Sequence, residues 1–145
     1  MLMKRINRSD PEKLFIVVKS VYATASLTTG QAVNWDLTNA DGISVTKPAA
    51  GTGINFAGIV VQTIADEAYG MIQVYGYNSS VRVLPCAVSA AAGTPLDLPA
   101  ANFALRTMIT ATTTGVVVTF PVGFSLEAYT LSGTTAAIAC FIKAL

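Results

Sequence analysis

The chain has 145 residues, which is enough for one domain with one buried core. Charged residues make up 12% of it and hydrophobic residues 52%, whereas soluble proteins carry about 25% charged residues. Nine basic and eight acidic residues leave a net charge of +1, so no excess of positive charge is available to attract nucleic acid or an anionic membrane. Histidine is absent, which excludes every catalytic site that depends on a histidine base and removes the commonest metal ligand.

Two uncharged stretches, residues 48–65 and 107–126, are long enough to be considered as membrane spans. Both contain glycine and proline, and 107–126 is also rich in threonine, a composition typical of strands joined by turns and not of a spanning helix. The short apolar run Leu14–Val18 follows an acidic, proline-bearing stretch, so the N-terminus does not resemble a secretory signal. We therefore expect no membrane partner and a protein that stays in the cytoplasm after synthesis.

The N-terminal segment is basic and lacks a hydrophobic period. Because residues 1–9 offer no apolar face for packing, we interpret residues 1–13 as an arm and residues 14–145 as one domain, with a solvated terminus as the alternative. Ser9 and Glu12 have the spacing of a capping box around Pro11, which predicts a helical turn or two at most. The candidate docking residues of this arm are Lys4, Arg5, Arg8 and Lys13.

The rest of the chain consists of short apolar runs separated by turn residues. The first run, Phe15–Tyr22, is rich in β-branched and aromatic residues, which favour a strand. Such runs at close intervals indicate an all-β sandwich or barrel. The further predicted strands are Gln31–Leu37, Ile43–Thr46, Ile54–Ile64, Gly70–Gly76, Val81–Leu84, Phe103–Thr110, Gly115–Phe120, Gly123–Thr130 and Ala136–Ile142.

Three local patterns refine this prediction. Gly70–Gly76 alternates, with Met71, Gln73 and Tyr75 on one face. Asn78-Ser79-Ser80 is predicted to be a hairpin turn, and Ala87–Pro99 a loop. Since no connection has room for a helical crossover, the sheet should be mostly antiparallel. The predicted fold is a single-domain, antiparallel β-barrel or β-sandwich of the β-tulip or jelly-roll kind, with a short N-terminal arm.

Residues able to carry chemistry are few. Asp66 and Glu67 are adjacent, so on a strand or turn their carboxylates would point apart, which does not suit acid–base work on one substrate. Asp36 and Asp41 flank a turn but supply far fewer oxygens than calcium requires. We therefore expect no catalytic site, no metal and no cofactor.

Two further sets of residues have a structural and a functional interpretation. Cys86 and Cys140 match no zinc or redox spacing, and we favour two buried thiols over a disulfide. The aromatic side chains belong to a core or an interface, or else they form a stacking platform for sugars or bases. The four aromatic residues in question are Trp35, Tyr69, Tyr75 and Tyr77.

Six segments, taken in order, carry a resemblance to a known family. They are Phe15–Lys19, Gln31–Asp36, Phe56–Val60, Tyr69–Gly76, Ala90–Leu96 and Val122–Ala128. The succession of an AGIVV strand, a YGMIQVYG strand, an AAGTPL turn and a VGFSLEA strand resembles the head decoration, or cement, proteins of tailed bacteriophages. The resemblance covers Phe15 to Leu145 and rests on the order of these segments.

This resemblance implies a structural virion protein with no enzymatic activity. Proteins of that family bind the outside of the capsid, commonly as trimers, and reinforce the shell. The implied partners are the major capsid protein and further copies of the chain, with assembly in the host cytoplasm and a final place on the capsid exterior. The shortage of charge agrees, because a chain this apolar is expected to cover part of its surface by association.

Two other functions remain open from the sequence. One is a carbohydrate-binding module or phage adhesin that uses Trp35 and the tyrosines. The other is an enzyme that acts through carboxylates, and the lack of histidine weighs against it. Its candidate residues are Asp36, Asp41, Asp66 and Glu127.

Overall fold

Nine runs of mainly apolar residues form the strands of one mixed sheet. The computed structural model describes residues 12–49, 55–84, 91–99, 102–108, 121–130 and 134–144. Within these ranges no helix is long and apolar enough to cross a lipid bilayer. The strands are β1 (Lys13–Ser20), β2 (Ala32–Trp35), β3 (Ser44–Thr46), β4 (Phe56–Val60), β5 (Tyr69–Leu84), β6 (Pro95–Asp97), β7 (Leu105–Thr107), β8 (Gly123–Ser125) and β9 (Ala136–Lys143).

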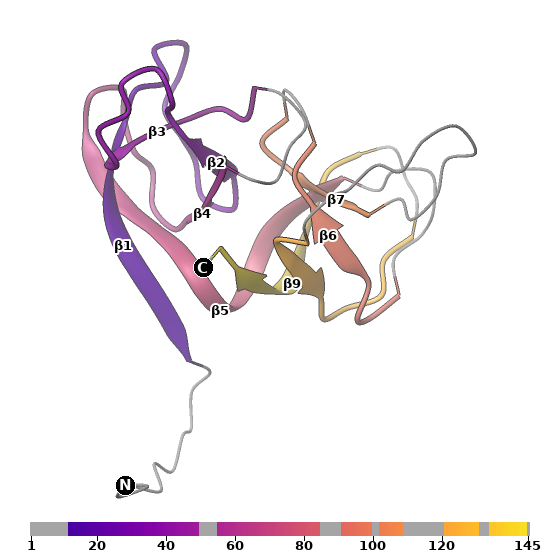
Figure 1. The fold of residues 1–145 in the computed structure, drawn as a ribbon. Coiled ribbons are helices and arrows are strands. Elements are labelled where there is room, and N and C mark those ends of the chain that lie inside the picture. Colours follow the sequence, from indigo (N-terminus) through magenta and orange to yellow (C-terminus); the bar gives the residue numbers. More distant parts are fainter. Residues whose placement is uncertain are drawn as a thin grey trace, which may run out of the picture.

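The sheet closes into two barrels that share β5. The strand order is β1-β3-β2-β4-β5-β7-β6-β8-β9, and additional β1–β5 and β5–β9 pairings close each half. The first barrel is β1-β3-β2-β4-β5 and the second is β5-β7-β6-β8-β9, so both have the same order in chain sequence. Each also contains one parallel pair in the same place, β1–β3 in the first and β5–β7 in the second. The second barrel therefore repeats the topology of the first (Figure 1).

Strand β5 joins the barrels because it is long and bends near its middle (Figure 1). Its first half pairs with β1 and β4, and its second half with β9 and β7. The predicted hairpin at Asn78-Ser79-Ser80 is wrong, since the chain passes through a β-bulge there and continues as one strand. Asn78 Nδ2 donates to Gln73 Oε1 at 3.0 Å and Asn78 Oδ1 accepts the Ser80 N–H at 2.9 Å, so its side chain supports a bend without a reversal.

Each barrel has its own apolar interior. Val18, Leu27 and Ile72 are buried in the first, and Leu96 and Leu105 in the second. Strand β4 is buried on both faces, because β2 and β4 lie between the two interiors and contribute side chains to each. Burial on both faces explains why this part of the sequence is apolar throughout and does not alternate.

The all-β prediction is confirmed, with differences of detail. The sheet is mixed, with two parallel pairs formed without any helix. A strand, β6, lies within the predicted loop Ala87–Pro99, and the predicted strand Gly115–Phe120 lies outside the described residues. Of the predicted capping box only Glu12 is described, and it is not helical.

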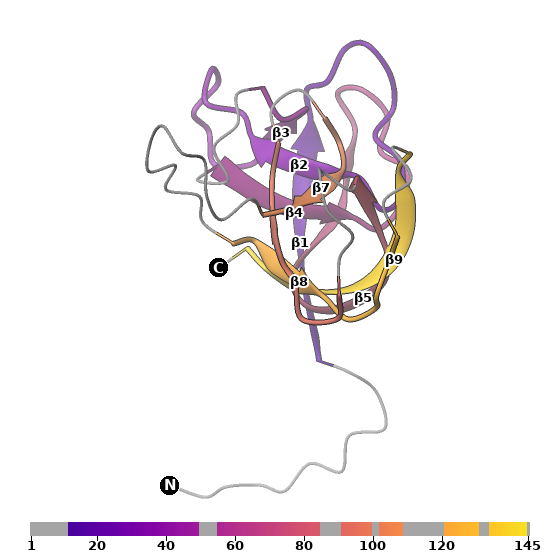
Figure 2. The ribbon, with the colours of Figure 1, turned by 90° about the vertical axis from the view of Figure 1, so that its right-hand side faces the viewer.

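The described chain begins close to β1. Lys13, assigned to the arm from the sequence, is the first residue of β1, and residues 1–11 lie outside the described part. The first residues of β1 pair with the middle of β5, Lys13 with Gly76 and Leu14 with Tyr75, while β9 follows the curve of β5 (Figure 2). The start of β1 therefore lies against the strand that joins the two barrels.

Candidate interaction surface

Large apolar side chains are exposed along the outward side of β1 and the first half of β5. The register pairs Val17 with Met71 and Phe15 with Gln73, while their neighbours Val18 and Ile72 point into the barrel. Opposed residues of an antiparallel pair share one side, so Phe15, Val17, Tyr69 and Met71 form one face. Val17 is 63% exposed and Tyr69 64% exposed. We call these four residues the outer face.

A row of aromatic rings continues from β5 across β9 to β8. The Tyr75 and Phe141 rings meet edge to face with centroids 5.1 Å apart, and Phe141 stacks on Phe124 at 5.3 Å. Gly123 allows β8 to approach, because a Cβ there would overlap the carbonyl oxygen of Phe141. The row is partly solvent-exposed at Phe124, so apolar surface extends over both barrels.

Of the predicted arm residues, only Lys13 is described. Its Nζ lies 5.7 Å from the centroid of the Tyr77 ring, beside the outer face. Gly76, with φ +98°, makes room for the chain to enter β1, because a Cβ there would overlap the carbonyl oxygen of Glu12. Lys4, Arg5 and Arg8 lie outside the described residues.

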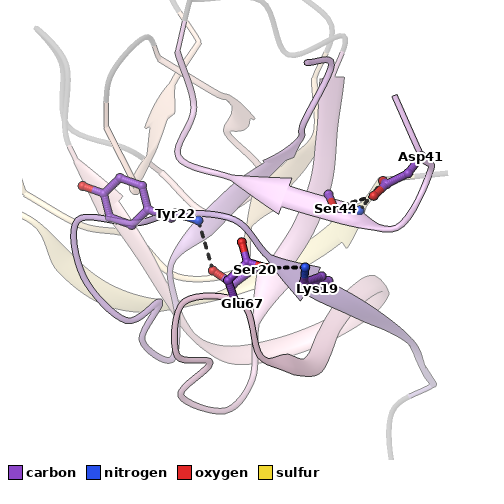
Figure 3. A network of polar contacts seen from close by, with 6 residues as sticks. All are labelled: Lys19, Ser20, Tyr22, Asp41, Ser44 and Glu67. Atoms are coloured by element: carbon purple, nitrogen blue, oxygen red, sulfur yellow. Dashed lines mark hydrogen bonds and ion pairs between the residues drawn. The ribbon is translucent and has the colours of Figure 1, made fainter. Parts of the chain in front are cut away.

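The polar groups at the other end of β1 stabilise turns (Figure 3). Lys19 forms an ion pair with Glu67, and this hydrogen-bonded contact raises the pKa of the lysine above its ordinary value. Asp41 accepts the Ser44 hydroxyl at 2.6 Å and the Ser44 N–H at 2.8 Å, and these hydrogen bonds lower the pKa of its carboxyl. These contacts hold the ends of strands in place.

Three of the four carboxylates considered for catalysis, those of Asp36, Asp41 and Glu127, accept backbone N–H groups. Asp36 accepts the N–H groups of Thr38 and Asn39, and Glu127 accepts the N–H of Ala139 at 3.4 Å. Asp66 and Glu67 lie in an exposed turn. In the described ranges, no three histidine, cysteine or acidic side chains gather as a metal site would require.

The structure does not bring Trp35 together with the tyrosines. Trp35 packs against the interior of the first barrel, and no ring contact joins it to a tyrosine among the described residues. Tyr69, Tyr75 and Tyr77 instead follow one side of β5. The platform predicted for sugars therefore lacks its tryptophan.

Sequence reasoning missed two arginines. Arg106 on β7 forms a bidentate pair with the buried Asp97 on β6, at 2.7 and 3.1 Å. Arg82 on β5 lines a surface hollow and donates to Thr28 at 2.9 Å. Neither pairing is visible from sequence, because the partners become neighbours only when the sheet closes.

The fold is similar to that of a known phage protein. No protein-family model matches the chain, and no curated protein matches it. Among solved structures, the chain is similar in fold to the N base of the head fiber gp8.5 in bacteriophage phi29. That likeness has a TM-score of 0.50 at 10% sequence identity, and it covers 92% of this chain and 96% of that one.

Proposed function

We propose that this protein is a structural component of a tailed-bacteriophage head, which binds the outside of the capsid as a decoration protein and stabilises the shell. The observation that carries the proposal is the outer face, where four large apolar side chains on two paired strands are exposed to solvent. Exposed apolar patches of this kind mark interaction surfaces. The likeness to a head fiber base supports a phage head as the place where the surface is used.

The outer face is suited to stable binding because its side chains are held by a closed barrel. Covering a large apolar side chain contributes up to about 1.5–3 kcal/mol, and a rigid sheet loses little entropy when it binds. In this proposal the basic residues Lys4, Arg5 and Arg8, together with Lys13 at the start of β1, add a salt-dependent attraction to the shell. Further copies of the chain associate as a homo-oligomer, for which the family resemblance favours a trimer.

Replacing Val17 with aspartate tests the proposal. A charge in the middle of the outer face would have to be desolvated on binding, so we expect at least tenfold weaker binding of the variant to capsids. The measurement is the fraction of protein that cosediments with capsids of the phage that encodes it. Because Val17 is already exposed, the thermal midpoint of the free protein should change little.

Leu37→Asp is the matched control. Leu37 is 66% exposed, about as much as Val17, but it lies in the turn after β2 and is not one of the four residues of the outer face. Equal binding of the two variants would contradict the role given to the outer face. Sedimentation of the free variants shows whether the outer face binds the capsid or a second copy of the chain. Val17→Asp will also reduce the oligomer size if copies of the chain meet at this face.

A further inference from the structure

A surface hollow lined by both polar and apolar residues lies where the two barrels meet. It has a volume of about 380 Å³ and opens to solvent. It lies between the turn before β2, the loop before β7, the first residues of β9 and the second half of β5. Its polar lining consists mainly of Gln31, Arg82, Asn102 and Thr135. We call it the Arg82 hollow.

Two hydrogen bonds hold Arg82 in the lining of this hollow. Its backbone N–H donates to the Gly30 carbonyl at 2.9 Å, and its Nη2 donates to Thr28 Oγ1 at 2.9 Å. Gly30, with φ +82°, permits this close approach, since a Cβ there would overlap the carbonyl oxygen of Ser80. The guanidinium is therefore oriented before any ligand arrives, with Nε and Nη1 still able to donate.

Among the described residues, no carboxylate balances the positive charge that Arg82 brings to the hollow. The carboxylate ion pairs of the described residues belong to Lys19 and Arg106, and none reaches Arg82, although its side chain is partly buried. A partly desolvated cation without a counter-ion is unfavourable until an anion binds.

The two amides point to the same ligand chemistry. Gln31 Oε1 accepts the Thr28 N–H at 2.7 Å, and Asn102 Oδ1 accepts the Ala104 N–H at 3.1 Å. Because both oxygens are used, each amide is left with its NH2 group as a donor. A guanidinium fork and amide donors in the lining of one hollow match the oxygens of a carboxylate.

We propose that the Arg82 hollow binds a carboxylate, supplied by an acidic side chain on the protein shell. The assignment of this carboxylate to the capsid shell rests on the proposed function, whereas the preference of the hollow for a carboxylate does not. We favour a protein carboxylate over an acidic sugar because Phe103, the one aromatic residue that lines the hollow, already packs against Tyr22 and has the Lys47 ammonium over its ring, which leaves little ring surface for a sugar to stack on. The ammonium of Lys47, 5.5 Å from the Phe103 centroid, adds positive charge nearby.

Titration with sodium acetate tests the carboxylate chemistry, with sodium chloride at the same ionic strength as reference. We expect saturable shifts of the side-chain NH2 signals of Gln31 and Asn102 in the NMR spectrum. Arg82→Gln should weaken acetate binding at least tenfold, and Arg82→Lys, which keeps the charge but loses the fork, about threefold. Lys143→Gln removes an exposed charge from β9 and should change nothing. Shifts that do not saturate, or that persist unchanged in Arg82→Gln, overturn the proposal.

Two binding measurements, one with capsids and one with an acidic sugar, test which molecule supplies the carboxylate. We expect Arg82→Gln to bind capsids at least tenfold more weakly while Lys143→Gln binds normally. If Arg82→Gln loses acetate but binds capsids as the wild type does, the assignment to the shell is overturned and the proposed function stands. N-acetylneuraminate binding tenfold tighter than acetate also overturns that assignment. If the wild-type protein binds acetate but no capsid, the proposed function fails, and the assignment to the shell with it.

Discussion

Cys140 illustrates how burial decides the chemistry of a single side chain. Its thiol lies in the interior of the second barrel, and burial raises its pKa to about 12. Because the thiolate is the reactive form, we expect Cys140 to resist a thiol reagent in the native protein and to react after denaturation in urea. Peptide mapping by mass spectrometry reads Cys140 separately from Cys86, which lies outside the described residues. Rapid labelling of Cys140 in the native state would contradict this burial.

The same raised pKa predicts a dependence of stability on pH. The folded state holds the thiol proton more tightly than the unfolded state, whose ordinary value is 9.0, so the stabilisation is complete below pH 9 and is lost as the pH rises towards 12. Between pH 9 and 10 the wild type should therefore lose about 1 kcal/mol more unfolding free energy than Cys140→Ala. Urea unfolding at the two pH values measures this, and parallel losses in the two proteins would exclude the contribution of Cys140.

At the scale of elements, the junction between β1 and β5 depends on one glycine. Gly76→Ala would place a methyl group against the carbonyl of Glu12 and would also strain the backbone at φ +98°. We expect a loss of about 1–3 kcal/mol in unfolding free energy, with the start of β1 detached. Hydrogen exchange should show lost protection at Leu14 and Phe15, while Val18 remains protected.

Gly42→Ala is the control that distinguishes backbone strain at a positive φ from the steric overlap with Glu12. Gly42 also has a positive φ, +72°, but nothing lies within 4 Å of a Cβ placed there. We expect it to lower stability through backbone strain alone and to leave β1 protected. Loss of protection at Leu14 in both variants would mean that the close approach of Glu12 is not what Gly76 provides.

Sequence patterns predicted the strands well where one face is buried, and poorly where a side chain redirects the chain. The alternation of Met71, Gln73 and Tyr75 correctly placed these residues on one side of a strand. It did not reveal that Asn78 would bond back to Gln73 and keep β5 continuous, because Asn-Ser-Ser is equally typical of a turn. A strand as short as β6 forms because it pairs with β7 and β8, and its three residues are too few to show an alternating pattern in the sequence.

The candidate surfaces were harder to predict than the strands. In Phe15-Ile16-Val17-Val18 both sides are apolar, so the sequence does not say which side faces solvent. The structure decides it, since the pairing with β5 points Val18 inward and Val17 outward. The Arg82 hollow had no sequence signal, because its lining comes from four segments that lie far apart in the chain.

At the scale of the whole molecule, two barrels of the same topology share one strand and a common wall. Strand β5 completes both barrels, and β2 and β4 present Ala32, Phe56 and Ile59 to the second interior and Val33, Ala57 and Val60 to the first. The two halves repeat the same strand order, and each half encloses its own apolar interior. Two interiors accommodate the many apolar residues of a chain that has few charges. Neither barrel is complete without the other.

This shared wall predicts that the molecule unfolds as one cooperative unit. Leu105→Ala removes a fully buried side chain from the second barrel, and we expect a loss of about 2–5 kcal/mol in unfolding free energy. Trp35, the single tryptophan, packs in the first barrel, so its fluorescence reports on that barrel alone. If the barrels are coupled, Leu105→Ala will lower the urea midpoint of Trp35 fluorescence as much as that of far-ultraviolet circular dichroism, and Leu27→Ala in the first barrel will do the same. A Trp35 transition that stays at the wild-type midpoint in Leu105→Ala would show that the first barrel folds independently, despite sharing β5.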